Sequence, residues 1–198
     1  GHWYSANNFS MAEHSGTHMD APIHFAEGRR DAAGVPIHQL IGPATVINVS
    51  VNASQDPDYQ VTVEDIHSWE SLYGRIPRGA LVLMYSGWAK YWGNKQKYLG
   101  SDNPSDITSL HFPSFSSEAA SFLISERQVD ALGVDTASID HGQSTDFAVH
   151  QIVHGANKPG FENIANLDQL PAVGTTVIAL PMKIAGGSGA PVRIIALL

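Results

Sequence analysis

Short apolar runs rich in Val, Ile and Leu recur along the chain, separated by segments that carry Gly, Pro, Asn and Asp. Apolar runs of about four to eight residues bounded by turn formers are typical of buried β-strands. The pattern therefore predicts five strands, at residues 44–51, 80–86, 131–135, 175–180 and 192–198.

Helical signals lie between these runs. Thr62 is a residue type that caps helices, and two acidic residues follow it, which predicts a helix ending near Tyr73. Two further helices are predicted over residues 117–127 and from residues 144–146 to 155, whereas residues 93–115 are expected to form a long loop. Strands interleaved with helices predict a mixed α/β domain.

Composition narrows the class of protein. The 198 residues are 43% hydrophobic and 15% charged, which is enough apolar material for the core of one domain. Lys and Arg number 11 against 19 Asp and Glu, a net charge of −8, and no basic run exceeds Arg29–Arg30. This argues against a nucleic-acid partner or an anionic-lipid surface. The apolar runs are far shorter than the ~18 residues of a membrane span, so no membrane partner is expected either.

The chain contains no cysteine. Disulfide bonds and thiolate metal ligands are therefore excluded. The compartment stays open, with a lean towards the cytoplasm, because secreted proteins can also lack cysteine.

Three of the ten histidines, His14, His18 and His24, lie within eleven residues, and Asp20 lies among them. All four positions are even-numbered. Because side chains alternate between the two faces of an extended chain, these four would point to one side. Imidazole and carboxylate groups are common ligands of Zn²⁺ and Mn²⁺, so the pattern indicates a metal site.

Distance adds a constraint to this site. If the chain were fully extended, His14 and Asp20 would lie about 20 Å apart, too far to share one ion. The segment must therefore curl, and Gly16 permits the unusual dihedral angles that this requires. Pro22 rules out a continuous helix and redirects the chain before His24. We expect a bent loop or irregular strand that wraps a cation.

The segment His14-Ser-Gly-Thr-His-Met-Asp-Ala-Pro-Ile-His24 resembles the signature of the cyclase-type metal-dependent hydrolases, which include bacterial-type kynurenine formamidase and isatin hydrolase. The resemblance continues through residues 133–140 and 150–171. It implies an α/β fold in one compact domain over residues 1–198, with a mixed, partly barrel-like β core flanked by helices (a swivelling β/β/α arrangement). It also implies that the N-terminal part is shortened, since only thirteen residues precede His14.

The resemblance further implies a reaction, the hydrolysis of a C–N bond in a small aromatic cyclic amide or formamide, assisted by one or two ions of Mn²⁺ or Zn²⁺. It implies a homo-oligomer, a dimer or tetramer. By position, His14, His18 and Asp20 match metal ligands, His24 matches the residue that accepts and donates the proton, and His150 and Glu162 match a pair that binds a second metal or contacts the substrate.

Two other functions remain open at this point. His18, Asp20 and His150 mimic the two-His-one-carboxylate triad of Fe(II) oxygenases, although the predicted helices disfavour that all-β architecture. A non-catalytic, metal-stabilised binding module is the other alternative.

Three residues outside the motif are also considered. A structural role is favoured for His154, although it lies four residues after His150 and would share a helix face with it. Trp3 and Trp88 could stack on an aromatic substrate, but ordinary packing is favoured for both.

Overall fold

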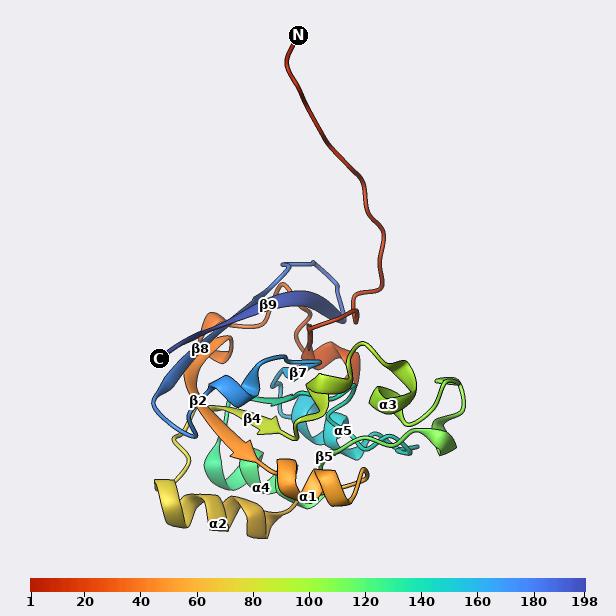
Figure 1. The fold of residues 1–198 in the computed structure, drawn as a ribbon. Helices are drawn as coiled ribbons and strands as arrows, with labels where there is room; N and C mark the ends of the chain where they lie inside the picture. The colour runs from red at the N-terminus through yellow and green to blue at the C-terminus, as the bar shows by residue number, and fades with distance from the viewer.

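Seven strands close into a mixed β-barrel, and the computed structural model describes residues 1–198 (Figure 1). The strands β7, β6, β4 and β2 run parallel to one another, and β1, β8 and β9 complete the barrel through antiparallel pairs. The predicted α/β class with a barrel-like core is confirmed. Around the barrel, the strands are β1 (His18–Asp20), β7 (Gly160–Glu162), β6 (Ala131–Val134), β4 (Leu81–Tyr85), β2 (Ile41–Asn48), β8 (Thr175–Pro181) and β9 (Gly189–Leu197).

Helices cover the outside of the parallel strands, and Figure 1 shows α1, α2 and α4 on one side of the barrel. The α-helices are α1 (Ser50–Gln55), α2 (Val63–Tyr73), α3 (Lys95–Leu99), α4 (Ser117–Phe122) and α5 (Ala148–Gly155). A separate parallel pair is formed by β3 (Gln60–Val61) and β5 (Ser114–Phe115). The 3₁₀ turns are η1 (Pro22–His24), η2 (Ile37–Gln39), η3 (Trp88–Tyr91), η4 (Ile107–Ser109) and η6 (Leu167–Gln169), and η5 (Leu123–Arg127) is a π-helical continuation of α4.

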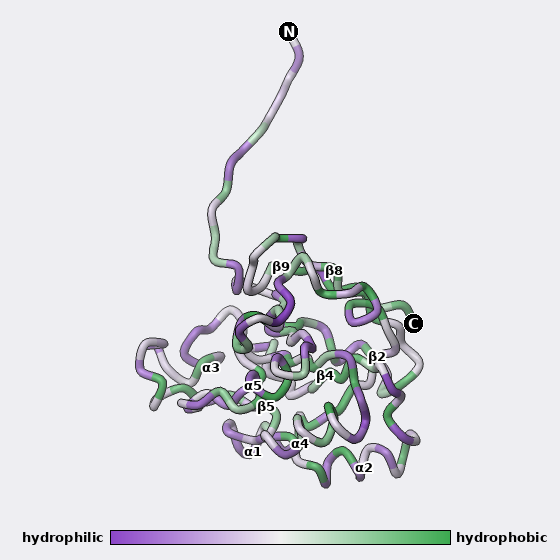
Figure 2. Tube along the Cα trace, turned by 180° about the vertical axis from the view of Figure 1, so that it is seen from behind, coloured by the Kyte–Doolittle hydropathy of each residue, from purple (hydrophilic) through white to green (hydrophobic).

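Two clusters of buried apolar side chains stabilise the fold, one inside the barrel and one between the barrel and the helices. In β4, Leu81 and Leu83 belong to the cluster inside the barrel, whereas Val82 and Met84 belong to the cluster between the barrel and the helices. Because both faces of the strand are covered, its sequence is continuously apolar rather than alternating. The strands accordingly include green segments in Figure 2, while the surrounding loops include purple ones.

The predicted helix after Thr62 is α2, and it begins with a capping box. The Thr62 hydroxyl accepts a hydrogen bond from the Asp65 backbone N–H, and the Asp65 carboxylate accepts one from the Thr62 backbone N–H. The strand predicted to reach residue 51 ends at Asn48, because α1 begins at Ser50. The loop predicted over residues 93–115 contains α3 and η4, and its last residues form β5.

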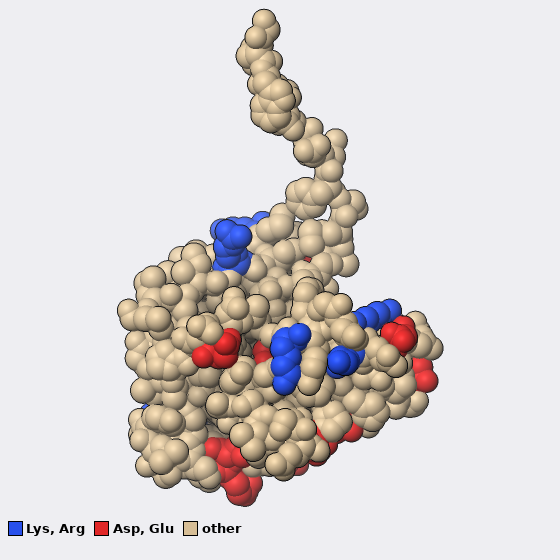
Figure 3. Space-filling model, in the orientation of Figure 1, with Lys and Arg blue, Asp and Glu red and all other residues tan.

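Residues 1–12 run away from the barrel as an extended, exposed segment (Figure 1). They include no Lys, Arg, Asp or Glu, so the segment is uniformly tan in Figure 3, whereas basic and acidic side chains both occur on the face of the barrel domain shown there. No helix in the structure is long and apolar enough to span a membrane.

A partly buried ion pair joins α2 to the π-helical turn η5. Arg127 donates from Nε to Glu70 Oε1 at 2.6 Å and from Nη2 to Glu70 Oε2 at 2.8 Å, and Glu70 Oε1 also accepts the Ile76 backbone N–H. The Arg127 hydrogen bonds are the main reason that the pKa of Glu70 is lowered. Because the folded state favours the ionised carboxylate, its stabilising contribution is present above the unfolded-state pKa and is lost as pH falls through the folded-state pKa.

Glu70→Gln should therefore lower the free energy of unfolding by about 2 kcal/mol near neutral pH. The difference from wild type should shrink as the pH falls to about 3, because the fraction of protonated wild-type carboxylate rises as pH falls towards its folded-state pKa. Urea unfolding at the two pH values measures both effects, with Glu126→Gln as the control because Glu126 is exposed. A difference that stays constant between the two pH values would contradict the assignment.

Candidate metal centre

The short strand β1 carries two polar side chains on the outer face of the barrel. His18 and Asp20 share one face, and Met19 between them is buried in the apolar cluster inside the barrel. The antiparallel register places His18 directly opposite Glu162 of β7. As a result, His18 Nε2 lies 3.2 Å from Asp20 Oδ1 and 3.3 Å from Glu162 Oε2. All three polar residues are buried.

His14 reaches the same place through a turn in the chain. Gly16 has a φ of +64°, in the left-handed region that glycine adopts without strain, as the sequence predicts. The turn brings His14 Nδ1 to 2.6 Å from Asp20 Oδ1. The ring lies against Gly189 of β9, where a Cβ atom would stand 2.5 Å from His14 Cε1 and 2.7 Å from the Met19 carbonyl oxygen. Only glycine leaves room for the His14 ring at that position.

Helix α5 lies beside β7 and supplies two further imidazoles. His150 Nε2 lies 3.5 Å from Asp20 Oδ2 and 3.3 Å from Glu162 Oε1. The Asp140 carboxylate accepts two backbone N–H groups at the start of α5 and also His150 Nδ1 at 2.6 Å, so it both caps the helix and orients the ring. His154 follows one turn later, fully buried, with its ring centroid 5.4 Å from that of His150.

Each of the four buried or part-buried imidazoles directs one ring nitrogen to a fixed acceptor outside the cluster. For His14 this acceptor is the Ser188 hydroxyl, which donates its own proton to Glu13 at 2.8 Å and therefore accepts from the ring. The four hydrogen bonds are His14 Nε2 to Ser188 Oγ (2.9 Å), His18 Nδ1 to the Gly16 carbonyl (2.8 Å), His150 Nδ1 to Asp140 Oδ2 (2.6 Å) and His154 Nδ1 to the Lys158 carbonyl (3.0 Å).

These hydrogen bonds leave the other nitrogen of each ring as a lone-pair donor turned towards the carboxylates of Asp20 and Glu162. Lone pairs that face one another repel unless a positive charge lies between them. Asp20 Oδ2 is buried and has no hydrogen-bond partner. Imidazole nitrogen and carboxylate oxygen are ligands that Zn²⁺ and Mn²⁺ accept, and ligating histidines typically donate their other N–H to a carbonyl or carboxylate. The residues present therefore fit a divalent cation.

The pKa values follow from the same arrangement. Burial disfavours the protonated form of His18, but hydrogen bonds and charge from Asp20 and Glu162 outweigh burial and raise the pKa of His18 to about 10. Burial also disfavours the protonated form of His150, but its hydrogen bonds to carboxylates, that to Asp140 first among them, outweigh burial and raise the pKa of His150. Despite burial, the imidazoles hold the pKa of Asp20 well below its usual range. The cluster therefore attracts positive charge.

His24 differs from the other imidazoles. It ends the 3₁₀ turn η1, which Pro22 begins, and its ring stacks on that of His14 with centroids 4.0 Å apart. The ring is partly exposed and makes no side-chain hydrogen bond within the chain. Burial lowers the pKa of His24 to about 4, with Asp20 opposing the shift and the neighbouring imidazoles adding to it. The ring is therefore neutral near neutral pH.

Two phenylalanines form an aromatic wall beside these histidines. The Phe25 ring lies 4.6 Å from that of His24 and 4.5 Å from that of His150, measured between centroids. Phe147 lies 5.1 Å from Phe25, is 37% exposed and has a φ of +51°, which is uncommon for a bulky residue. Sequence reasoning did not single out either residue, and the only signal was that Phe25 directly follows the histidine motif.

Six predicted site residues come together here: His14, His18, Asp20, His24, His150 and Glu162. Trp3 and Trp88 do not join them. Trp3 is 89% exposed in the extended N-terminal segment, and Trp88 is buried with Tyr98 and Phe112. His154, for which the sequence favours a structural role, instead lies in the cluster, where its ligand atom and those of Asp20 and His150 are all within 4.8 Å of one another.

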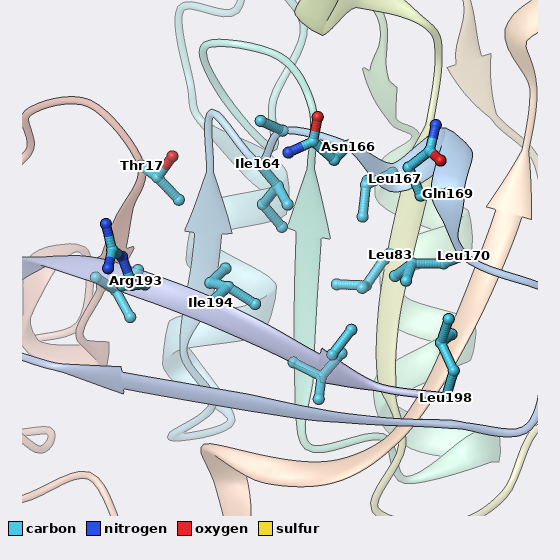
Figure 4. Close-up of a pocket in the computed structure, with 14 residues that line it drawn as sticks. Thr17, Leu83, Ile164, Asn166, Leu167, Gln169, Leu170, Arg193, Ile194 and Leu198 are labelled. Carbon is cyan, nitrogen blue, oxygen red and sulfur yellow. The ribbon is translucent and has the colours of Figure 1, made fainter.

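A separate cavity of about 490 Å³ lies beside β9 (Figure 4). Apolar side chains such as Leu83 and Ile194 line most of it, with Thr17 and Arg193 at one end. None of the six converging residues lines this cavity. Thr17, which lines the cavity, directly precedes His18 in the sequence. Because successive side chains of an extended chain point to opposite faces, the cavity and the imidazole cluster lie on opposite sides of this segment.

The barrel and its convergent imidazoles and carboxylates define a class, the metal-dependent hydrolases of the cyclase type. The profile of the family described as putative cyclase matches residues 1–141, and the chain belongs to this family.

The relatives agree with this assignment. Isatin hydrolase of Roseibium aggregatum is 35% identical over 205 residues, covering 100% of this chain and 76% of the relative. Kynurenine formamidase of Bacillus cytotoxicus is 32% identical and covers 94% of this chain and 77% of the relative. The solved structure of isatin hydrolase A from Ralstonia solanacearum is 38% identical with a TM-score of 0.90, covering 98% of this chain and 75% of that one.

Gly189→Ala should weaken Zn²⁺ binding at least about tenfold, because the added Cβ must displace the His14 ring or the β1 backbone. Equilibrium dialysis followed by metal analysis measures this effect. Gly93→Ala is the matched control, since a Cβ at Gly93 meets no atom within 4 Å. Unchanged affinity in the Gly189 variant would contradict the placement of His14 at the site.

Proposed function

We propose that this chain hydrolyses the C–N bond of a small aromatic cyclic amide or formamide, using a divalent cation, Mn²⁺ or Zn²⁺, held by His14, His18 and Asp20. The observation that carries the proposal is the convergence of imidazole lone pairs on buried carboxylates. His150 and Glu162 would hold a second ion or contact the substrate. One domain, residues 1–198, would contain all of these groups.

The chemistry that a divalent cation supplies at such a site is a lower pKa for a water molecule and polarisation of the scissile carbonyl group. Asp20 contributes negative charge from a buried position, and His14 and His18 contribute imidazole nitrogens. The hydrogen bonds to Ser188 and to the Gly16 carbonyl hold the two rings in the orientation this requires.

His24 is suited to move the proton. Hydrolysis breaks the C–N bond, adds hydroxide from water to the carbonyl carbon and adds a proton to the departing nitrogen. Because the ring of His24 is neutral, it can accept the proton of water and then return it to the nitrogen. Its partial exposure and unpaired nitrogens leave both the water and the leaving group within reach.

An aromatic substrate is favoured for two reasons. The relatives are named for isatin and for a formamide of kynurenine, both of which are aromatic. In addition, Phe25 and Phe147 offer ring faces next to His24 and His150, where an aromatic group could stack. Phe147 is the more exposed of the two rings and would contact the substrate first.

The two alternative functions fit less well. An Fe(II) oxygenase would leave His14 and His24 without roles, although both lie against the cluster. A purely structural metal site would be closed by protein ligands, whereas His24 keeps a partly exposed, unpaired ring beside it.

We also propose a dimer or tetramer, because Trp3, Tyr4 and Phe9 expose apolar surface that a second copy could cover. Light scattering measures that mass.

Removing divalent cations should abolish hydrolysis of isatin or N-formylkynurenine, and adding Mn²⁺ or Zn²⁺ should restore it. Product formation followed by absorbance before chelation, after chelation and after reconstitution tests this directly. If the chelated protein, shown to be metal-free, turned over either substrate at the metal-loaded rate, the proposed function would be wrong.

His24→Ala should lower kcat by about 10²- to 10⁴-fold while leaving metal content unchanged, since the proton carrier is lost but the predicted ligands remain. His38→Ala is the control, because His38 is an exposed histidine on η2. Kinetics and metal analysis on the same preparations separate the two effects. A variant that lost its metal would reassign His24 as a ligand, and one that kept full kcat would remove its catalytic role.

A further inference from the structure

His154 is the one member of the cluster that the proposed function does not use. It lies on α5, four residues after His150, and its side chain is fully buried. Its Nδ1 donates a hydrogen bond to the Lys158 carbonyl at 3.0 Å, which fixes the tautomer. Its Nε2 is buried and has no hydrogen-bond partner. A buried acceptor without a partner destabilises the fold, and an apolar side chain of similar size would avoid this cost.

A second buried atom without a hydrogen-bond partner, Asp20 Oδ2, belongs to the same group of potential ligands as His154. The ligand atoms of Asp20, His150 and His154 all lie within 4.8 Å of one another. Two atoms that bind one ion through bonds of about 2.1 Å lie at most about 4.2 Å apart, so small side-chain shifts would bring these three to one ion.

The backbone of β7 leaves space for this arrangement at Gly160. A Cβ atom there would lie 3.6 Å from Asp20 Oδ2 and 3.7 Å from His154 Cε1, so the region between these two groups borders a residue without a side chain. Ile139 Cδ1 is the nearest atom to that Cβ position, at 3.3 Å, so one apolar side chain also borders the region between Asp20 and His154.

The two oxygens of Asp20 also divide the imidazoles into two sets. Oδ1 lies 2.6 Å from His14 Nδ1 and 3.2 Å from His18 Nε2, whereas Oδ2 lies 3.5 Å from His150 Nε2. His154 belongs with the Oδ2 set. A carboxylate that offers each oxygen to a different pair of imidazoles is arranged to serve two cations at once.

We infer that His154 Nε2 is a ligand for a second cation, in a site completed by Asp20 Oδ2 and His150 Nε2. The inference rests on the proposed metal centre and adds to it a ligand that comes from α5 rather than from the histidine motif or β7. With His154 present, the second position has two imidazoles and a carboxylate, the ligand set of an open zinc site.

The test counts Zn²⁺ ions bound per chain, by equilibrium dialysis with metal analysis over a range of free Zn²⁺. The wild-type protein is expected to bind two ions in two steps. His154→Leu should weaken the second step at least about tenfold and leave the first within about twofold, because it removes a ligand of only one ion. His38→Leu, on the exposed turn η2, is the matched control and should bind as wild type.

The outcomes separate this inference from the proposed function. If wild type binds one ion only, or if His154→Leu binds both ions as tightly as wild type, the inference is overturned and the first site stands. If no Zn²⁺ binds at all, the metal centre itself fails and the inference fails with it.

A second measurement needs no variant and covers the case in which His154→Leu does not fold. Anomalous scattering from wild-type crystals grown with Zn²⁺ should show a peak about 2.1 Å from His154 Nε2, together with one among His14, His18 and Asp20. A peak at the first position alone, with water or nothing at His154 Nε2, would overturn the inference.

Discussion

The structure depends on one electrostatic constraint, which is that several lone pairs point at the same two buried carboxylates. Four imidazoles each have one nitrogen committed to an acceptor outside the cluster, so their remaining nitrogens are left for the buried carboxylates of the cluster. Such an arrangement is unfavourable unless positive charge enters it, whether as protons or as a metal ion. The raised pKa of His18 and the lowered pKa of Asp20 both reflect this demand. Binding of a cation must therefore displace protons, which links the site to pH.

The barrel makes this constraint possible because the strand that closes it also carries two of the proposed ligands, His18 and Asp20. Only three residues long, β1 pairs with β7 on one side and with β9 on the other. Its outward side chains meet Glu162 from β7 and the imidazoles of α5, while Met19 anchors the strand in the interior. Gly189 in β9 keeps clear the space that the His14 ring occupies. A cation held by β1, β7 and α5 would cross-link elements far apart in sequence, so it would stabilise the closed barrel as well as serve the reaction.

Local features of the sequence predict one half of the site. The shared parity of His18 and Asp20, the left-handed turn at Gly16 and the redirection at Pro22 follow from backbone rules that act within a few residues. The other half depends on long-range pairing. The register that sets Glu162 opposite His18 joins residues 144 positions apart, and neither β1 nor β7 is long enough to show a periodic pattern. The family resemblance, rather than spacing, singled out His150 and Glu162. Burial of His154 and the aromatic wall of Phe25 and Phe147 arise only when α5 docks beside η1, so residue types alone could not distinguish them from Trp3 and Trp88.

Among five neighbouring imidazoles, hydrogen bonding separates the proposed ligands from the proposed proton carrier. A ring whose outer N–H is fixed has one orientation and one free lone pair, which suits a metal ligand but prevents the ring from exchanging protons at both nitrogens. His14, His18, His150 and His154 are all held in this way. His24 is held by ring contacts with His14 and Phe25 rather than by a side-chain hydrogen bond, so both of its nitrogens remain available and its ring can turn without breaking a hydrogen bond. A group that must accept a proton at one stage of a reaction and release it at another needs this freedom. Stacking on His14 thus places His24 beside a proposed metal ligand and leaves the ring nitrogens of His24 free to act on the substrate.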